Sequence, residues 1–596
     1  MKDLLADNSV LGLKFGQDPY LDAWLLHFMT ENNLDHQLNP QINASPEQLR
    51  FIVALDEKQV FIPCPDEELR QLFFAGTNPD LLSIYNRQWR RLARFVRNNV
   101  RERCLWRRII MLCRYKYRMV LASPVMIPAR LMKRFLDIFL TQTSLVDPMQ
   151  EAKINANAKA QEFISSGLMQ EILDGCVEEV RSCNSVQELR RILDIEEVRR
   201  LMCLGTWKDI WLKPLSSLKL NADCVLQSSA ESRELLDRIL GQKRPRELGL
   251  KILFLPEDSG GLILDLQLIR ALLQQGHQVT LALKEGFYFA VPTFWDPEQD
   301  QTLASALAGA RYVSQSQLSK NQLLQQQREN PFLVISDGTR ERLNFYRTSV
   351  TFARSWKESD LILAKGLDNY KQLILNSHEF TRDVLCFYRE NGHLQLDFKP
   401  RNKDVVHYNE SQLLAMSEEI IQNMREARSA GKTVMFYSAI VGSIPGQTKK
   451  AVKILEAFVH YLRSRLPQTL IINPAEHFQP GLDADDLMYV WEKVQRSGLI
   501  DVWRFQTVQD IEKSFELLQE EMPTTWIGKD ATFSTGCTKE MRIALEMQKV
   551  YPELQIIGPE PEKFFRRREY GIGKFFDATI AEEGGKGIAV RKMGGR

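Results

Sequence analysis

The sequence predicts an α/β protein of several domains: a helical N-terminal region, a doubly wound and mostly parallel sheet in the middle, and a second, Rossmann-like α/β domain at the C-terminus. Its 596 residues exceed what a single hydrophobic core supports. Short apolar runs alternate with segments of helical periodicity from residue 250 onward, and the alternation starts again near residue 432. Such alternation is typical of parallel sheets with helices between their strands.

Composition and charge narrow the class of protein. The chain is 44% hydrophobic and 26% charged, as is usual for globular domains. Its 78 basic and 76 acidic residues give a net charge of +2, so no overall field favours nucleic acid or an acidic membrane. The nine cysteines include no Cys-x-x-Cys pair, which indicates free thiols in a reducing compartment. Without an apolar run of membrane-spanning length, we expect no transmembrane segment and a cytoplasmic location.

The first predicted domain, residues 1–145, reads as helical, and residues 86–118 within it are dense in arginine. Two interpretations of this stretch are open. It is either the solvated cationic face of an amphipathic helix, or a docking surface for an anionic partner or a membrane surface. The arginines in question are Arg87, Arg90, Arg91, Arg94, Arg97, Arg101, Arg103, Arg107, Arg108, Arg114 and Arg118.

The second predicted domain, residues 146–400, has a helical part at 146–245 and an α/β part at 246–400. Apolar runs predict its strands, and a long segment at 262–276 has helical spacing. Parallel sheets of this kind bind ligands at the carboxyl ends of their strands, where we expect the polar motifs described below to gather. The predicted strands are 250–257, 277–286, 332–338 and 360–366.

The remainder is predicted to be a linker at 401–431, a Rossmann-like domain at 432–580 and a disordered tail at 581–596. Its predicted strands are 432–442, 469–474, 500–505, 522–528 and 554–559, with a helix at 449–466. Two loops, 442–449 and 534–538, lie where a phosphate-binding loop would lie in such a fold, although each also reads as an ordinary structural loop. Cys537, in the second loop, is either a nucleophile or a buried thiol.

The first strand of the middle domain is followed by the sequence EDSGG at residues 257–261. Glu257 and Asp258 are adjacent carboxylates at a strand tip, and the small residues after them open a helix. This combination suits a hard divalent cation beside a phosphate, because carboxylate oxygens hold the ion and a helix N-terminus favours the anion. Plain capping of the helix is the alternative interpretation.

Five segments, in order, resemble motifs of the damage-control phosphatases, also called the acidic-residue methyltransferase-like family. The most specific is KGLDNY at 365–370, which matches a Lys-Gly-x-x-Asn-Tyr/Phe element. The resemblance covers about residues 145–400. The other segments are Asp147-Pro148 with Lys153, Asn155 and Asn157, then GTWKD at 205–209, EDSGG at 257–261 with Asp265, and VISDG at 334–338.

This resemblance implies a metal-dependent phosphatase, a phosphomonoester hydrolase that acts on a small phosphorylated metabolite such as a sugar phosphate or a damaged cofactor. A divalent metal, Mn²⁺ or Mg²⁺, is the implied cofactor. Lys365 is expected to be an exposed lysine at a strand end that holds the substrate phosphate. The implied roles are catalysis by Asp258 and Lys365, substrate binding by Lys365, Asn369, Asp337 and Gly366, and metal binding by Glu257, Asp258 and Asp296.

The chain departs from the family pattern at several positions. The family's Asp-Asn metal pair is Glu257-Asp258 here, its following Glu is Gly261, and an Asn is replaced by Thr206. A noncatalytic binding or assembly protein that keeps the fold therefore stays an alternative. A transferase that binds a phosphorylated donor at the 534–538 loop is another. The sequence indicates no oligomeric state.

Overall fold

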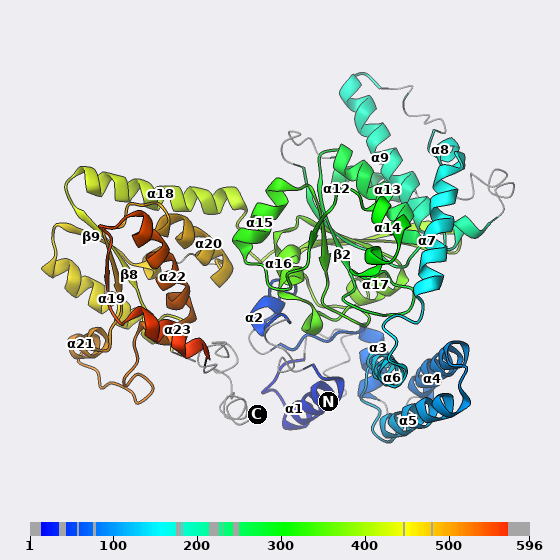
Figure 1. Ribbon diagram of the computed structural model, residues 1–596, viewed down its shortest axis with the longest axis horizontal. Coiled ribbons are helices and arrows are strands. Elements are labelled where there is room, and N and C mark those ends of the chain that lie inside the picture. The colour runs from blue at the N-terminus through cyan, green and yellow to red at the C-terminus, as the bar shows by residue number, and fades with distance from the viewer. Residues whose placement is uncertain are drawn as a thin grey trace. The chain divides into compact units, whose positions relative to one another are not determined.

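The computed structural model describes residues 13–34, 43–56, 59–74, 79–174, 180, 183–213, 226–228, 230–241, 249–444, 447–477, 479 and 481–569 (Figure 1). The chain divides into two compact units, Met1–Asn402 and Lys403–Arg596. The tail predicted to be disordered, 581–596, lies outside the described residues.

The first unit is built on a seven-stranded sheet with the order β3-β4-β2-β1-β5-β6-β7. All neighbouring strands are parallel except β6 and β7. The chain extends the sheet from β1 to one side through β2 and then returns to the other side of β1 with β5, which makes a topological switch point between β1 and β5. The strands are β1 (Lys251–Leu255), β2 (Gln278–Leu283), β3 (Arg311–Val313), β4 (Phe332–Ser336), β5 (Leu361–Lys365), β6 (Asp383–Glu390) and β7 (His393–Lys399).

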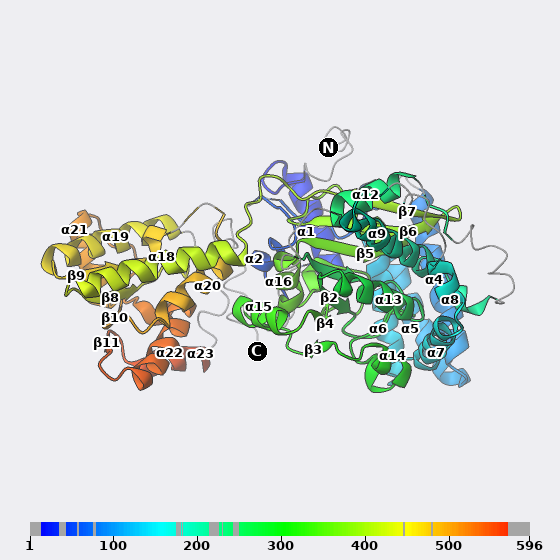
Figure 2. The same cartoon turned by 90° about the horizontal axis from the view of Figure 1, so that it is seen from above.

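Side chains along the central strands alternate between two hydrophobic cores. Leu253 and Leu255 of β1 pack with residues of the N-terminal helices, whereas Ile252 and Phe254 pack against the helices on the opposite face. Figure 2 shows α16 (Val350–Glu358) on one side of the strands and α13 (Gly261–Gln274) on the other. Because both faces are covered, the central strands read as nearly continuous apolar runs.

The helices of this unit form two groups in sequence. The N-terminal group is α1 (Pro19–Asn32), α2 (Pro46–Leu49), α3 (Asp66–Phe73), α4 (Pro79–Asn99), α5 (Arg103–Ala122) and α6 (Pro128–Thr143). The other group is α7 (Gln150–Ser165), α8 (Leu168–Leu173), α9 (Val186–Gly205), η4 (Ile210–Leu212), α12 (Ala230–Leu240), α13 (Gly261–Gln274), η6 (Asp296–Glu298), α14 (Gln301–Ala306), α15 (Lys320–Glu329), η7 (Phe345–Arg347), α16 (Val350–Glu358) and α17 (Leu367–Leu373).

The arginine-rich stretch is two helices, α4 and α5, with a break at residues 100–102. All eleven arginines identified from the sequence are exposed. The apolar residues between them are directed inward: Leu92, Val96 and Ile109 are fully buried in the core that also contains α6. Both helices are therefore amphipathic, as the spacing of their apolar residues predicts.

The second unit contains a four-stranded sheet with the order β11-β10-β8-β9, parallel throughout. Its strands are β8 (Thr433–Ser438), β9 (Thr469–Ile472), β10 (Val502–Phe505) and β11 (Gln555–Ile557). Its helices are α18 (Glu410–Ser429), α19 (Thr448–Arg465), η8 (Pro474–His477), α20 (Ala484–Gln495), α21 (Val508–Leu518), η9 (Ala531–Phe533), α22 (Thr535–Val550) and α23 (Pro561–Glu569). The predicted class, an α/β protein with a large, mostly parallel sheet and a second parallel sheet, is confirmed.

One predicted strand, 522–528, is wrong. The segment consists of turns, and its Trp526 is buried against Phe515 at a ring-centroid distance of 6.1 Å. Pro523 has no amide hydrogen to donate to a strand ladder, so the apolar character of this segment serves the core rather than a sheet. In none of the described ranges does a helix combine the length and apolarity needed to cross a membrane.

Candidate active site at the switch point

The carboxyl ends of β1 and β5 meet at the switch point of the seven-stranded sheet. Leu255 pairs with Ala364, so Lys365 and the residues after Leu255 leave the sheet at the same edge. Both motifs singled out from the sequence, 257–261 and 365–370, therefore lie side by side although about a hundred residues separate them. In an open α/β sheet this is the edge where ligands bind.

Lys365 is almost fully buried and forms an ion pair with Asp265 of α13. Its Nζ lies 2.7 Å from Oδ1 and 2.9 Å from Oδ2 of Asp265, and each side chain is 1% exposed. Burial alone would lower the pKa of Lys365, but Asp265 and Asp258 more than offset this, and the pKa is raised. The expectation of an exposed lysine is wrong, because the apolar strand end and α13 enclose its side chain.

Two glycines make room for this ion pair. A Cβ on Gly261 would lie 2.4 Å from Oδ1 of Asp258 and 2.9 Å from Nζ of Lys365. A Cβ on Gly205, at the end of α9, would lie 3.0 Å from Oδ1 of Asp265. Real Cβ atoms essentially never come as close as the contacts at Gly261, so this position requires glycine as long as the charged groups keep their places, whereas at Gly205 the Asp265 carboxylate would have to shift slightly.

Glu257 lies directly on the backbone of Gly366. Gly366 has φ +92°, and a Cβ there would lie 2.2 Å from the carboxyl carbon of Glu257. The space that a side chain at position 366 would need is thus taken by the Glu257 carboxylate. Burial, and then the neighbouring charge of Asp258, raise the pKa of Glu257.

Asp258 is partly buried beside the same ion pair. Burial raises its pKa, Lys365 opposes the rise, and Asp209 adds to it. The next residue, Ser259, is 5% exposed, and its Oγ has no hydrogen-bond partner among the described residues. Among the residues that the structure describes, neither Glu257 nor Asp258 forms an ion pair within 4.0 Å.

Asn369 lies in α17, one turn beyond the end of β5. Its Nδ2 donates to the carbonyl of Lys365 at 2.8 Å and lies 3.5 Å from the carbonyl of Leu255. The side chain thus ties together the ends of β1 and β5. In this arrangement its amide hydrogens are directed at the strand ends rather than outward.

Two predicted site residues are held elsewhere. Asp296 accepts from Nζ of Lys153 at 3.0 Å, and Asp337 accepts from Nζ of Lys284 at 2.6 Å. Within the described ranges, no three or more His, Cys, Asp or Glu side chains form a group that could hold a metal ion. Five of the predicted site residues therefore lie together at the switch point: Glu257, Asp258, Lys365, Gly366 and Asn369. The contacts described for Asp296 and Asp337 do not connect them to this group.

The upstream motif on α7 supports the same edge. Oδ1 of Asn157 accepts from the backbone amide of Gly260 at 2.5 Å, and its Nδ2 donates to Asp300 at 2.7 Å. Asn157 thereby fixes the start of α13. Lys153, one turn earlier on α7, also pairs with Asp147 at 2.5 Å.

Sequence reasoning assigned no role to Asp265, Gly205 or Ser259. Asp265 and Gly205 belong to motifs described above. Asp265 is the lone acid in the largely apolar run LILDLQLI at 262–269, which is a usable signal for a buried, paired carboxylate. The orphaned hydroxyl of Ser259 has no such signal, because its burial depends on packing from distant elements.

In the second unit, Cys537 is 2% exposed, and its thiol donates to the carbonyl of Ala439 at 3.3 Å. Burial, and then the neighbouring Glu540, raise its pKa well above the ordinary value for a thiol. Cys537 is thus a buried thiol rather than a poised thiolate. Of the other loop, 442–449, residues 445–446 lie outside the described residues.

Comparison with known proteins gives a distant structural likeness. No protein-family model matches the chain, and no curated protein matches it. Among solved structures, the chain is similar to the crystal structure of a DUF89 family protein from Pyrococcus horikoshii, at 17% sequence identity and a TM-score of 0.35. The match covers 52% of this chain and 90% of that chain.

Proposed function

We propose that the switch point of the seven-stranded sheet is the active site of a metal-dependent phosphatase that acts on a small phosphorylated metabolite. The observation that carries the proposal is the position of Glu257 and Asp258: two carboxylates at a sheet edge, beside a buried ammonium and a helix start. This is the combination that divalent-metal phosphate chemistry uses. The sequence motifs that resemble the damage-control phosphatases support the same conclusion.

The residues present fit a hard divalent cation, Mn²⁺ or Mg²⁺. Glu257, Asp258 and the unpartnered hydroxyl of Ser259 are all oxygen donors, and Mg²⁺ often takes only one or two carboxylates, with water and substrate oxygens completing its shell. Burial raises the pKa of the Glu257 and Asp258 carboxyls, and a neighbouring acid raises each further. A bound cation would offset this unfavourable electrostatic energy of the charged carboxylates. When bound, the metal would polarise a phosphoryl oxygen.

The other groups act on the substrate's negative charge. Lys365 supplies a positive charge whose position is fixed by Asp265, so little reorganisation is needed as charge develops on the phosphoryl oxygens. The start of α13, at Gly261, adds the positive end of a helix dipole, which favours an anion. Asn369 keeps the two strand ends in register, which makes it a positioning residue in this proposal.

A noncatalytic binding protein is the second candidate, and specific observations favour it. Lys365 is already neutralised by Asp265, and two more of the expected site residues, Asp296 and Asp337, are engaged by lysines. A protein of this kind would bind a phosphorylated ligand at the same edge without hydrolysing it.

Metal content and hydrolysis of the purified full-length protein test the proposal together. We expect Mn²⁺ or Mg²⁺ to raise the melting temperature, and a screen of sugar phosphates and nucleotides to find a hydrolysed substrate. Asp258→Asn should abolish the metal-dependent shift and reduce turnover by roughly 10²–10³-fold. Glu329→Gln, an exposed acid at the end of α15, serves as the matched control and should change neither.

The two candidates give different results in this experiment. A metal-dependent shift without hydrolysis of any compound in the panel would favour the binding protein. Absence of any shift at millimolar metal, together with an inert panel, would rule out the phosphatase.

A further inference from the structure

The outer faces of α4 and α5 carry a concentration of positive charge that the proposed phosphatase site does not use. Residues 79–122 contain eleven arginines and one lysine, against only Asp80 and Glu102 as acids. Every one of these arginines is exposed. The chain as a whole has a net charge of only +2, so this pair of helices is a local exception.

Helix geometry gathers the charges into rows. Arg87, Arg90, Arg94 and Arg97 recur at intervals of three and four residues, which places them on one face of α4. Tyr117 of α5 stacks on Trp89 of α4 at 5.3 Å, and the α5 turns on either side of Tyr117 carry Arg114 and Arg118. The helices α4 and α5 therefore pack against each other, and both carry exposed arginines.

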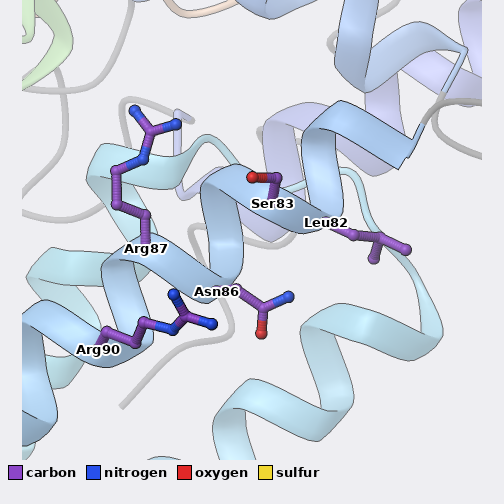
Figure 3. A pocket seen from close by; sticks show the side chains of 5 residues that line it. All are labelled: Leu82, Ser83, Asn86, Arg87 and Arg90. Atoms are coloured by element: carbon purple, nitrogen blue, oxygen red, sulfur yellow. The ribbon is translucent and has the colours of Figure 1, made fainter.

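Arg87 and Arg90 also line a hollow on α4, which Figure 3 shows with its side chains. Its volume is about 360 Å³, which is large enough to admit a phosphate-bearing headgroup. Its lining consists of Leu82, Ser83, Asn86, Arg87 and Arg90. Asn86 is held in place by the hydroxyl of Tyr117, which donates to its Oδ1 at 2.8 Å.

Apolar side chains stand exposed among these charges. Met111, Tyr115 and Met119 lie at i, i+4 and i+8 on α5, and they are 65%, 62% and 51% exposed. They therefore form a row along the outer face of this helix, opposite its buried residues Ile109 and Cys113. Arginines occur in the same turns: Arg107 and Arg108 precede Met111, and Arg114 and Arg118 flank Tyr115.

We propose that this α4/α5 face docks on the surface of a membrane that contains anionic phospholipids. Arginines would pair with lipid phosphates, while Met111, Tyr115 and Met119 would enter the headgroup region. A nucleic acid would use the arginines but would gain little from an exposed methionine row. A second copy of the chain would be repelled, because both faces would carry the same charge.

The inference is independent of the phosphatase proposal and needs no activity measurement. The full-length protein is sedimented with vesicles of phosphatidylcholine, with and without phosphatidylserine. We expect binding only to the anionic vesicles, with the bound fraction decreasing as salt is added. Since each arginine near such a surface contributes about 1 kcal/mol, roughly a fivefold change in affinity, Arg90→Gln, Arg94→Gln and Arg97→Gln combined should weaken binding about a hundredfold.

A second variant tests the apolar row by itself. Met111→Gln, Tyr115→Gln and Met119→Gln combined leave the charge unchanged and should still weaken vesicle binding at least tenfold, since each loses apolar area placed in the headgroup region. The matched control, Arg190→Gln, Arg191→Gln and Arg311→Gln, removes three exposed arginines elsewhere on the same unit and should bind like the unaltered protein. All these positions are exposed, so the folded state is expected to persist, as circular dichroism would verify.

Two outcomes would overturn the proposal. One is failure of the unaltered protein to bind anionic vesicles at low salt. The other has two parts: the apolar variant binds anionic vesicles as well as the unaltered protein does, and the arginine variant loses the retention of the unaltered protein on single-stranded or duplex DNA. This result would identify the face as a nucleic-acid surface.

Discussion

In both sheets polar groups gather at the carboxyl ends of the parallel strands, but the charged groups at these two edges differ. In the seven-stranded sheet, the buried carboxyl of Asp265 is paired with the ammonium of Lys365 at 2.7 Å. In the four-stranded sheet, the buried carboxyl of Glu540 on α22 accepts from the neutral amide of Gln495 at 3.1 Å. At each edge a helix begins with a glycine in its first turn: Gly261 in α13 and Gly536 in α22.

This difference shows that topology determines where polar loops gather but not which chemistry they support. At the edge of the four-stranded sheet, several neutral groups bond to one another: Nε1 of Trp503 donates to Oγ of Ser438 at 2.9 Å, and Oε1 of Gln506 accepts from the amide of Ile440 at 3.1 Å. The buried carboxyl of Asp510, at the start of α21, is paired with Arg504 of β10 at 2.7 Å. The edge of the seven-stranded sheet concentrates three carboxyls around one ammonium. This cluster of carboxyls around one ammonium is the feature on which the proposed metal and phosphate site rests.

The largest expected effect comes from breaking the buried ion pair. Lys365→Met leaves Asp265 buried without a cation, which typically costs about 3–5 kcal/mol of folding stability. Because the chain has two units, the loss should be measured locally, as faster native-state hydrogen exchange of the β1 and β5 amides. Exchange of the β8 and β10 amides in the second unit serves as the internal control and should not change.

A compensating change sharpens this prediction. Adding Asp265→Leu to Lys365→Met removes the uncompensated charge, and replacing a buried ion pair by apolar residues of similar volume is often close to neutral. We therefore expect the double variant to recover most of the lost protection. If the single variant exchanges like the unaltered protein, the pair does not contribute to the stability of this edge.

A smaller effect is expected at the two helix-start glycines. Gly261→Ala places a Cβ 2.4 Å from Asp258 and 2.9 Å from Lys365, and overpacking of this kind costs about 1–3 kcal/mol. At Gly536 the nearest atom, Oγ of Ser534, lies 3.5 Å away, so Gly536→Ala meets no clash and should be neutral or stabilising by up to about 1 kcal/mol. Thermal unfolding of both variants should separate them by sign, and equal effects would contradict the crowding inferred at Gly261.

The sequence predicted the location of the candidate site better than its contacts. A strand followed by Glu257 and Asp258, and another ending at Lys365, are local patterns, and the rule for parallel sheets predicts that their ends lie at one edge. The partner of Lys365 is not local: Asp265 reaches it from a helix a hundred residues earlier, so burial of the lysine depends on how α13 packs on the sheet. Asp296 and Asp337 were likewise assigned without their lysine partners, which come from distant segments.

Among the elements, the apolar runs of the buried strands were predictable because both faces of these strands are covered. The β6–β7 hairpin was not predicted although its signal is present. Asn391 and Gly392 connect two runs of strand-forming residues and adopt φ of 50° and 86°, as a tight two-residue hairpin turn requires. The segment 522–528 gave the opposite error, because an inward-packed tryptophan in a turn has the same local composition as a short strand.

The smallest effect, and the most direct test of the contrast between the two edges, is the pH dependence of Glu540. Burial raises its pKa, and the hydrogen bonds from Ser438, Gln495 and Cys537 offset this only in part. A carboxyl whose folded pKa is raised stabilises the fold fully below its unfolded pKa, 4.5, and this contribution is lost as the pH rises through the folded value.

Glu540→Gln removes the titrating group while keeping a hydrogen-bonding side chain of the same size. The urea midpoint of the variant relative to the unaltered protein should therefore increase from about pH 4.5 toward neutral pH. Each pH unit by which the folded pKa exceeds the unfolded pKa corresponds to about 1.4 kcal/mol of unfolding free energy. Asp265→Asn should instead be destabilising at neutral pH, because it removes the counterion of a buried ammonium. If Glu540→Gln changes the urea midpoint by the same amount at pH 4.5 and at neutral pH, the pKa of Glu540 is not raised by burial. The proposed difference between the two sheet edges would then be wrong.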